Sequence, residues 1–488
     1  MNLNYFRTLC YSLFGLAMCT TAFAKPVPLP NPGITGYNFP ESKETLMSWI
    51  NNGNAQSISL HGWGLWTSLT APSGQSEFGL TNVPVYVTWL SPAEIAALPQ
   101  PSPAAVNAPK RQFKLEQPRQ FSHKGVKVEQ AIIKNSTTSP SAASSSTAAV
   151  VPDTAIAVTM GYDPSAQAFA HSNNLFSLTA LQKIYNSGTG PIRAIPTFPN
   201  TAVTIKPTYK IISSANMING SIYVMPAWPG TPPVITKEIT EKGFPESVWP
   251  GCVYINTKNA SKSSATGVDP DCKTGPTAAN TFGLGDFINF AVTSNNIANF
   301  ETLTGETLSV GDFIILIAMH VTTREIDEWT WQTYFWTPNP ANPPLPSSKA
   351  IASARPAQLT GAAAHYAMAI GYQMVAPNQP IIGGKSVGSP VTVYNPYLES
   401  PFSAAVFGAP PVNVGIQKSG AKKPYMATVG VQSNCMTCHG NASINPSNPD
   451  SNTNSLPYLT NFYVSRDDAA FTGYLQTDFL WSIQGTAK

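Results

Sequence analysis

The sequence predicts an α+β, strand-rich fold: a β-sandwich-like body with attached helices and a C-terminal segment of different character. Short apolar stretches recur along the chain, and 45 prolines and 34 glycines punctuate them. Only 11% of the residues are charged, against roughly 25% in ordinary soluble domains. This composition favours a loop-rich protein built largely from strands over a helical bundle.

The apolar periodicity places the individual elements. Helices are expected over residues 41–51, 165–186 and 287–300. Strands are expected over residues 83–90, 202–212, 221–226, 252–256, 313–321, 328–336, 365–374 and 391–394. Even the most apolar of these runs, 313–321, is far shorter than the ~20 residues that cross a membrane.

Residues 1–24 have the pattern of an export signal. Arg7 supplies a positive charge, a short apolar stretch follows, and Ala22-Phe23-Ala24 is a typical cleavage site. We therefore expect cleavage after Ala24, a periplasmic location, and no membrane span in the mature chain.

The remaining chain divides into four parts by composition: 25–95 as the N-terminal part of the body, 96–152 as an insertion, 153–430 as the strand-rich body, and 431–488 as the C-terminal segment. The insertion is rich in proline, then in basic residues, then in serine, threonine and alanine. Such a stretch buries too little apolar surface to fold alone, so we expect a flexible low-complexity linker. The net charge of the whole chain is only +3, which gives no indication of a nucleic-acid partner.

Six cysteines are present, and two of them lie in the predicted signal. Cys252 and Cys272 are expected to form a disulfide, because an oxidising compartment favours pairing. Closing a loop of this length contributes about 3 kcal/mol in the chain-entropy model. The alternative is a pair of buried free thiols.

The other two cysteines stand in Cys435-Met436-Thr437-Cys438-His439, a complete C-x-x-C-H motif. One helical turn places the two thiols and the imidazole on one face, where the thiols can add to the two vinyl groups of a porphyrin. The motif therefore predicts one covalent haem c, tethered by Cys435 and Cys438, with His439 as the iron ligand. A zinc site and a thiol–disulfide active site are the alternatives.

In this motif the chain resembles the c-type cytochromes. It differs from the small soluble members in that neither Met nor His follows His439. As a whole, the chain also looks like a group of large secreted single-haem bacterial proteins. The stretches that carry this likeness are 319–325, 329–333 and 477–483. The resemblance implies a cytochrome and says little about a substrate.

A sixth iron ligand from the protein must come from upstream of the motif. We favour His320, because the apolar run before it would bury the imidazole. The other candidates are Met319, His61, His365, Met368, Met374 and Met426. Each histidine also has a simpler interpretation as a hydrogen-bonded structural residue. Arg324 is either a solvated strand-end residue or a partner for a haem propionate.

The sequence thus predicts a periplasmic mono-haem c-type cytochrome that acts in electron transfer with an unidentified redox partner. One alternative is a haem-dependent, peroxidase-like oxidoreductase acting on a small organic substrate. Another is a haem-based binding or sensing protein. The state of the sixth iron position separates electron transfer from the other two.

Overall fold

The computed structural model describes residues 25–78, 80–99, 156–304, 307–378, 388–408, 428–448 and 455–488. The predicted signal 1–24 lies outside these residues, as do Met426 and all but the first four positions of the predicted insertion.

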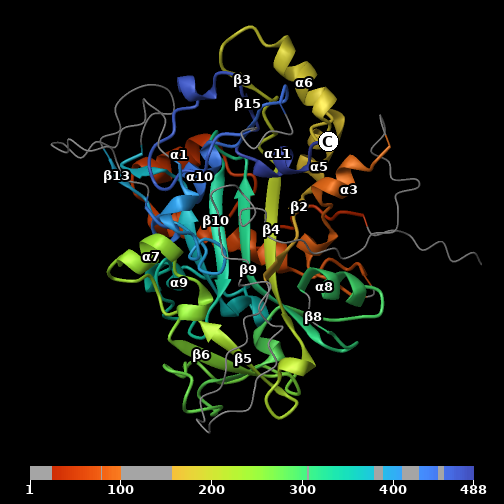
Figure 1. Cartoon of the computed structure of the whole chain (residues 1–488), viewed down its shortest axis with the longest axis vertical. Helices are drawn as coiled ribbons and strands as arrows, with labels where there is room; N and C mark the ends of the chain where they lie inside the picture. The colour runs from red at the N-terminus through yellow and green to blue at the C-terminus, as the bar shows by residue number, and fades with distance from the viewer. Residues whose placement is uncertain are drawn as a thin grey trace, which may run out of the picture.

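A large antiparallel sheet forms the centre of the molecule, with strand order β1-β4-β9-β10-β11; β2 also pairs with β4, and β8 with β9 (Figure 1). Its strands are β1 (Ile156–Val158), β2 (Gly161–Tyr162), β4 (Val203–Ile212), β8 (Asn289–Ala291), β9 (Phe313–Thr323), β10 (Thr330–Trp336) and β11 (Tyr366–Gly371). Four of them, β4, β9, β10 and β11, lie in stretches expected to be strands. The predicted α+β, strand-rich class is confirmed.

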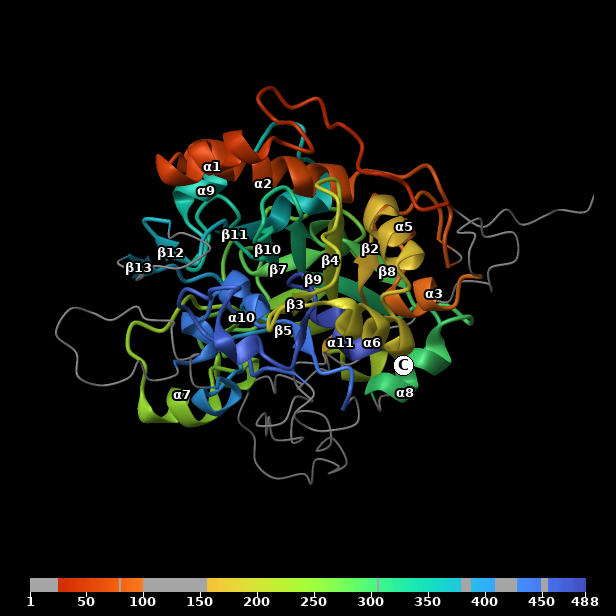
Figure 2. The same ribbon diagram turned by 90° about the horizontal axis from the view of Figure 1, so that it is seen from above.

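Two helices, α1 (Lys43–Asn51) and α2 (Ala55–Thr70), cover one face of this sheet (Figure 2). Ser42 caps α1 by accepting a hydrogen bond from the backbone N–H of Thr45. The apolar side of α2 carries Trp63 and Trp66, both fully buried, and Trp66 stacks on Tyr334 of β10 at 4.3 Å between ring centroids. Both tryptophans are therefore core residues.

The C-terminal segment covers the other face with α10 (Cys435–Gly440) and α11 (Trp481–Thr486) (Figure 2). A small sheet joins β14 (Ser443–Ile444), β15 (Leu475–Gln476) and β3 (Arg193–Ala194). We call the part of the molecule around α10 and α11 the cavity end.

The remaining helices and strands near this end or along the sides are α3 (Pro92–Ala96), α5 (Pro164–Ser172), α6 (Leu178–Ser187), α7 (Lys237–Lys242), α8 (Ile297–Thr304), α9 (Lys349–Ser353), β12 (Val375–Ala376) and β13 (Ser389–Pro390).

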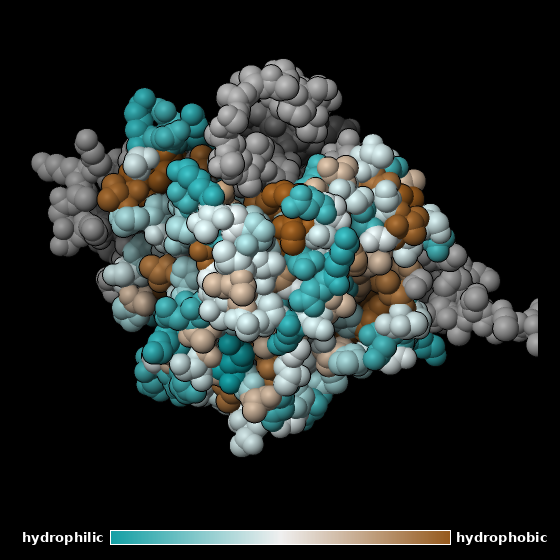
Figure 3. Space-filling view, turned by 90° about the horizontal axis from the view of Figure 1, so that it is seen from below, coloured by the Kyte–Doolittle hydropathy of each residue, from teal (hydrophilic) through white to brown (hydrophobic). Residues whose placement is uncertain are grey.

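The opposite end of the long axis is built on a second small sheet of β5 (Ile222–Ala227), β6 (Gly251–Asn256) and β7 (Thr281–Gly283) (Figure 1). Cys252 on β6 forms a disulfide with Cys272, with 5.5 Å between their Cα atoms. This confirms the predicted pairing, and we call this part the disulfide end. Seen from that side, hydrophobic residues lie in small groups among hydrophilic ones (Figure 3).

Two of the three predicted helices are wrong in extent. The predicted helix 165–186 is divided into α5 and α6, because Asn174 adopts a left-handed backbone conformation, φ 51°, that ends α5. The predicted helix 287–300 begins instead as β8, which pairs with β9. Only after a turn, in which the Asn296 side chain accepts from the Thr293 N–H, does α8 start.

Two predicted strands are also absent as such. Residues 83–90 contain a 3-10 turn, Val85–Thr88, in which the Thr88 hydroxyl donates to the Val85 carbonyl. The apolar residues there are buried beneath α2, which removes the need for a strand partner. Residues 391–394 contribute only one isolated bridge, from Val393 to Asn434. Within the described ranges, no helix combines the length and the apolar character needed to cross a bilayer.

Candidate functional site

The C-x-x-C-H motif forms α10, a helix too short to be stable without support from neighbouring residues. Asn434 supplies that support, because its side-chain oxygen accepts from the Thr437 N–H at 3.0 Å. Its side-chain amide donates to the Val391 carbonyl at 2.7 Å, which fixes the start of α10 to the body. Asn434 is fully buried, so the helix start is held firmly in place.

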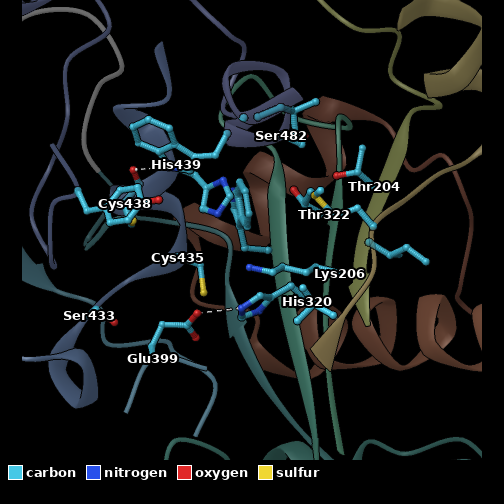
Figure 4. Close-up of a pocket in the computed structure, with 18 of the residues that line it drawn as sticks. Thr204, Lys206, His320, Thr322, Glu399, Ser433, Cys435, Cys438, His439 and Ser482 are labelled. Atoms are coloured by element: carbon cyan, nitrogen blue, oxygen red, sulfur yellow. Dashed lines mark hydrogen bonds and ion pairs between the residues drawn. The ribbon is translucent and has the colours of Figure 1, made fainter. Parts of the chain in front are cut away.

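Cys435, Cys438 and His439 all line one cavity between α10 and the central sheet (Figure 4). The cavity holds about 1240 Å³ of space between atoms, its open mouth included. Much of its surface is apolar, with contributions from Val158, Met160, Phe402, Phe407, Tyr458 and Trp481. The motif therefore opens onto a large space with mainly hydrophobic walls.

The His439 ring is held by one hydrogen bond, between Nδ1 and the carbonyl oxygen of Phe479 at 2.7 Å. A carbonyl only accepts, so Nδ1 carries the proton and Nε2 keeps its lone pair. Burial lowers the pKa of His439 to about 3, with smaller contributions from the neighbouring charges of His320 and Lys206, so the imidazole is neutral. The Trp331 ring lies against it, 4.2 Å between centroids. An oriented, neutral imidazole of this kind has the lone pair that a metal ligand needs.

The two cysteines of the motif are not bonded to each other. Burial, together with the charge of Glu399, raises the pKa of the Cys438 thiol to about 12 and holds the pKa of the Cys435 thiol well above its usual value. Thiol–disulfide catalysis needs a lowered pKa, because the thiolate is the nucleophile. The environment disfavours that alternative and suits uncharged sulfur, as in a thioether.

The arrangement of side chains does not favour the alternative of a zinc site either. Among the residues that the structure describes, no group of three or more His, Cys, Asp or Glu side chains is arranged to hold an ion. A haem iron does not need such a group, because the porphyrin supplies four of its ligands and the protein one or two.

The wall opposite α10 is formed by the central sheet. Lys206 on β4 lies directly beside His320 on β9, and Thr204 lies beside Thr322 in the same register (Figure 4). All four residues line the cavity. Strand alternation puts Met319 on the other face of β9, where it is fully buried in the core.

His320 does not stand free in the cavity. Its Nε2 lies 3.0 Å from Glu399 Oε1, and Glu399 Oε2 accepts from the Asn395 N–H at 2.7 Å. Glu399 is placed by the segment that leads into α10, since a Cβ on Gly430 would stand only 1.7 Å from the Glu399 carbonyl oxygen. His320 and Glu399 thus form a fixed pair at the edge of the cavity.

The other candidate ligands lie elsewhere. His61 is enclosed between Tyr372 and Glu325, and His365 pairs with Asp286 at 3.0 Å. Met368 and Met374 are core residues. None of these four lines the cavity. Arg324 does not line it either; its guanidinium contacts Asp478, Asp327 and the Ile326 carbonyl.

Among the lining residues that the sequence did not single out are Lys206, Glu399 and Met160. Thr204 and Lys206 did carry a signal, because they alternate with Val203 and Ile205 in an otherwise apolar strand and therefore share one face. Glu399 and Met160 carried none, since their positions depend on long-range packing. Searches with protein-family models, curated proteins and solved structures found no match to this chain.

Proposed function

We propose that this protein is a periplasmic mono-haem c-type cytochrome. In this proposal Cys435 and Cys438 are the thioether tethers and His439 is the axial ligand of the iron. One observation carries it: the three side chains of the motif share one helical turn and face one large, mainly apolar cavity.

The residues present fit a haem in three respects. The cavity has the largely apolar lining that a porphyrin needs. The thiols lie in a setting that favours uncharged sulfur. The lone pair of His439 Nε2 is available, because Nδ1 is engaged by Phe479. Covalent haem attachment takes place outside the cytoplasm, and residues 1–24 predict that this chain is exported.

The most economical role is one-electron transfer, because a bound haem iron supplies one electron per redox step. The chain's part is to hold and shield the group. Phe479 fixes the orientation of His439, and Trp331 packs against the same ring. The apolar walls exclude water, which tunes the potential of a buried haem.

A second role, binding or chemistry at the iron, is favoured by one observation. The wall opposite α10 carries Lys206, His320 and Glu399, polar groups that a simple electron carrier does not require.

The central test is expression together with a c-type haem maturation system. We expect an intact mass that exceeds the polypeptide from Lys25 onward by one haem, and haem that stays with the chain in denaturing electrophoresis. The double variant Cys435→Ser/Cys438→Ser should lose covalent haem. The double variant Cys252→Ser/Cys272→Ser removes as many sulfurs and should keep it. A wild-type mass equal to polypeptide alone would contradict the proposal.

The optical and electron-paramagnetic spectra of the purified protein then separate the two roles. Two protein ligands in both oxidation states favour electron transfer. An open or easily displaced sixth position favours binding or catalysis.

A further inference from the structure

We propose that Arg466 is a positioning residue for His439: it joins the end of α10 to the turn that carries Phe479, and so keeps the Phe479 carbonyl on His439 Nδ1. This inference rests on the proposed function and deepens it, because it assigns the control of the axial ligand to one side chain of the C-terminal segment. Arg466 does not line the cavity, so it would act through its neighbours.

The turn is formed by residues 477–480. The Leu480 N–H donates to the Thr477 carbonyl at 2.9 Å, and the two central residues, Asp478 and Phe479, have φ values of 47° and 68°. Positive φ at both central positions is the pattern of a type I′ turn, in which glycine is favoured at the second position. Phenylalanine is strained there, because a bulky side chain disfavours a left-handed backbone. Glycine would place the same carbonyl at lower cost, so the turn alone does not account for the phenyl ring.

Contacts on both central residues hold the turn in this conformation. Asp478 Oδ2 accepts from the Phe198 N–H at 3.2 Å and from Arg324 Nε at 3.3 Å. The Phe479 ring is buried, and the guanidinium carbon of Arg466 lies 4.6 Å from its centroid. A guanidinium group is attracted to an aromatic face in this position. A strained conformation persists only where its surroundings fix it, as these contacts do.

Arg466 contacts α10 with the same guanidinium group. Its Nη1 donates to the Gly440 carbonyl at 2.8 Å, at the end of the helix, where carbonyls lack intrahelical partners. Gly440 follows His439 directly, and the Phe479 carbonyl accepts from His439 Nδ1 at 2.7 Å. One side chain therefore connects the backbone beside the ligand to the residue that orients the ligand. Outer contacts of this kind fix an imidazole and raise its basicity as a ligand.

Arg466 is itself placed by the C-terminal segment. Its carbonyl accepts from the Gln476 side-chain amide at 2.6 Å, and its guanidinium carbon lies 5.4 Å from the centroid of the Phe471 ring. Arg466, the turn and the end of α10 thus form one connected unit. Loss of Arg466 should therefore loosen the hydrogen bond at His439.

The test measures this hydrogen bond in the holoprotein, after mass spectrometry has established covalent haem. NMR of the ferrous protein under carbon monoxide, with isotope-labelled histidine, gives the rate at which the His439 Nδ1 proton exchanges with water. Arg466→Met and Phe479→Leu each break the contact between guanidinium and ring, and each should raise this rate about ten-fold or more. The double variant should exchange less than about twice as fast as the faster single variant, because both substitutions remove the same contact.

The reduction potential separates positioning from charge. A weaker hydrogen bond makes the imidazole a poorer donor to ferric iron. The potential of Phe479→Leu, which removes no charge, should therefore rise.

Arg355→Met is the matched control. Arg355 also lies over an aromatic ring, 4.7 Å from the Trp63 centroid, and donates to the Pro340 and Tyr366 carbonyls. The substitution removes the same group beside α2, and it should change neither the exchange rate nor the potential.

Exchange at the wild-type rate in Arg466→Met and Phe479→Leu would overturn the inference, as would additive effects in the double variant or an unchanged potential in Phe479→Leu. Equal changes in Arg355→Met and Arg466→Met would overturn it too, since they would show a general loss of packing. If Arg466→Met does not fold, Phe479→Leu tests the same contact without removing a charge. Absence of covalent haem by mass would overturn the proposed function as well, whereas the other results leave it standing.

Discussion

The two ends of the molecule carry the same kinds of side chain in different surroundings (Figure 1). Each end has one cysteine pair and one histidine whose Nε2 lies 3.0 Å from a carboxylate oxygen. At the cavity end the pair is His320 with Glu399, and at the disulfide end it is His365 with Asp286.

At the disulfide end the cysteines, the histidine and the carboxylate all make contacts that stabilise the fold. Cys252 is closed on Cys272, and Asp286 accepts from the Ser263 and Gly283 N–H groups as well as facing His365. At the cavity end the cysteines are unpaired and the histidine–carboxylate pair borders open space. The cavity is therefore what distinguishes the cysteines and histidine of the cavity end from similar side chains at the disulfide end. Substitutions at the cavity end should alter the haem spectrum, and substitutions at the disulfide end should alter stability.

The largest effect is expected for His439→Gly at the cavity end. Covalent haem should remain, but the iron should lose its axial imidazole and become high-spin, and added imidazole should restore the original spectrum. Optical and electron-paramagnetic spectroscopy measure both steps. His365→Gln is the control at the other end, where the spectrum should not change. A native spectrum in His439→Gly would remove His439 as the ligand.

The next effect is on stability, from Cys252→Ala/Cys272→Ala at the disulfide end. Opening a link across 20 residues should lower the free energy of unfolding by about 3 kcal/mol, as the unfolded chain regains freedom. Denaturant titration of the haem-loaded protein measures it. The Soret band should stay in place, and a displaced band would show that the two ends are coupled.

Asp286→Asn should cost about 1–3 kcal/mol at pH 7 by weakening buried hydrogen bonds. Burial alone would raise the pKa of Asp286, but His365 and the backbone of Ser263 and Gly283 hold it below its usual value. Its stabilisation is therefore present above pH 4 or so and is lost as the pH falls through the lowered folded pKa.

In unfolding titrations from pH 7 to pH 3, the free energy of unfolding should accordingly fall less with decreasing pH for Asp286→Asn than for wild type. Asp271→Asn, at a half-exposed position near Cys272, is the control and should follow wild type. Parallel curves for wild type and Asp286→Asn would contradict the assignment.

The smallest effect is expected for His320→Gln. The unfolding free energy should fall by no more than about 1 kcal/mol, because the pair with Glu399 lies at a cavity edge. The spin state should stay the same, whereas a change from low to high spin would establish His320 as the sixth ligand that the sequence suggested.

The sequence predicted those parts of the fold that depend on local pattern. The apolar run of β9 and the Ser42 cap of α1 are local signals, and both appear in the structure as expected. The predicted strand 83–90 failed because its apolar residues are buried by α2, a contact that alternation cannot reveal. The predicted helix 287–300 failed because β9 offered its first residues a strand partner.

The candidate site divides in the same way. Cys435, Cys438 and His439 are contiguous, so the sequence alone brings them together. Lys206 joins them only through the pairing of β4 with β9, and Glu399 only through the close approach of Gly430. Those contacts join residues far apart in the sequence, and local sequence patterns do not predict such contacts.

The hydrogen bond from His439 to Phe479 also has a consequence for the order of synthesis. Phe479 lies 40 residues after His439, and the Trp481 indole, which donates to the Cys438 carbonyl, lies 43 residues after Cys438. Both thiols and the imidazole are therefore synthesised before the residues that cover them, and export of the chain from its amino terminus would deliver them to the periplasm in the same order. In the proposed function, the residues of α10 would be accessible to a haem-attaching enzyme until Phe479 and Trp481 arrive and close the site.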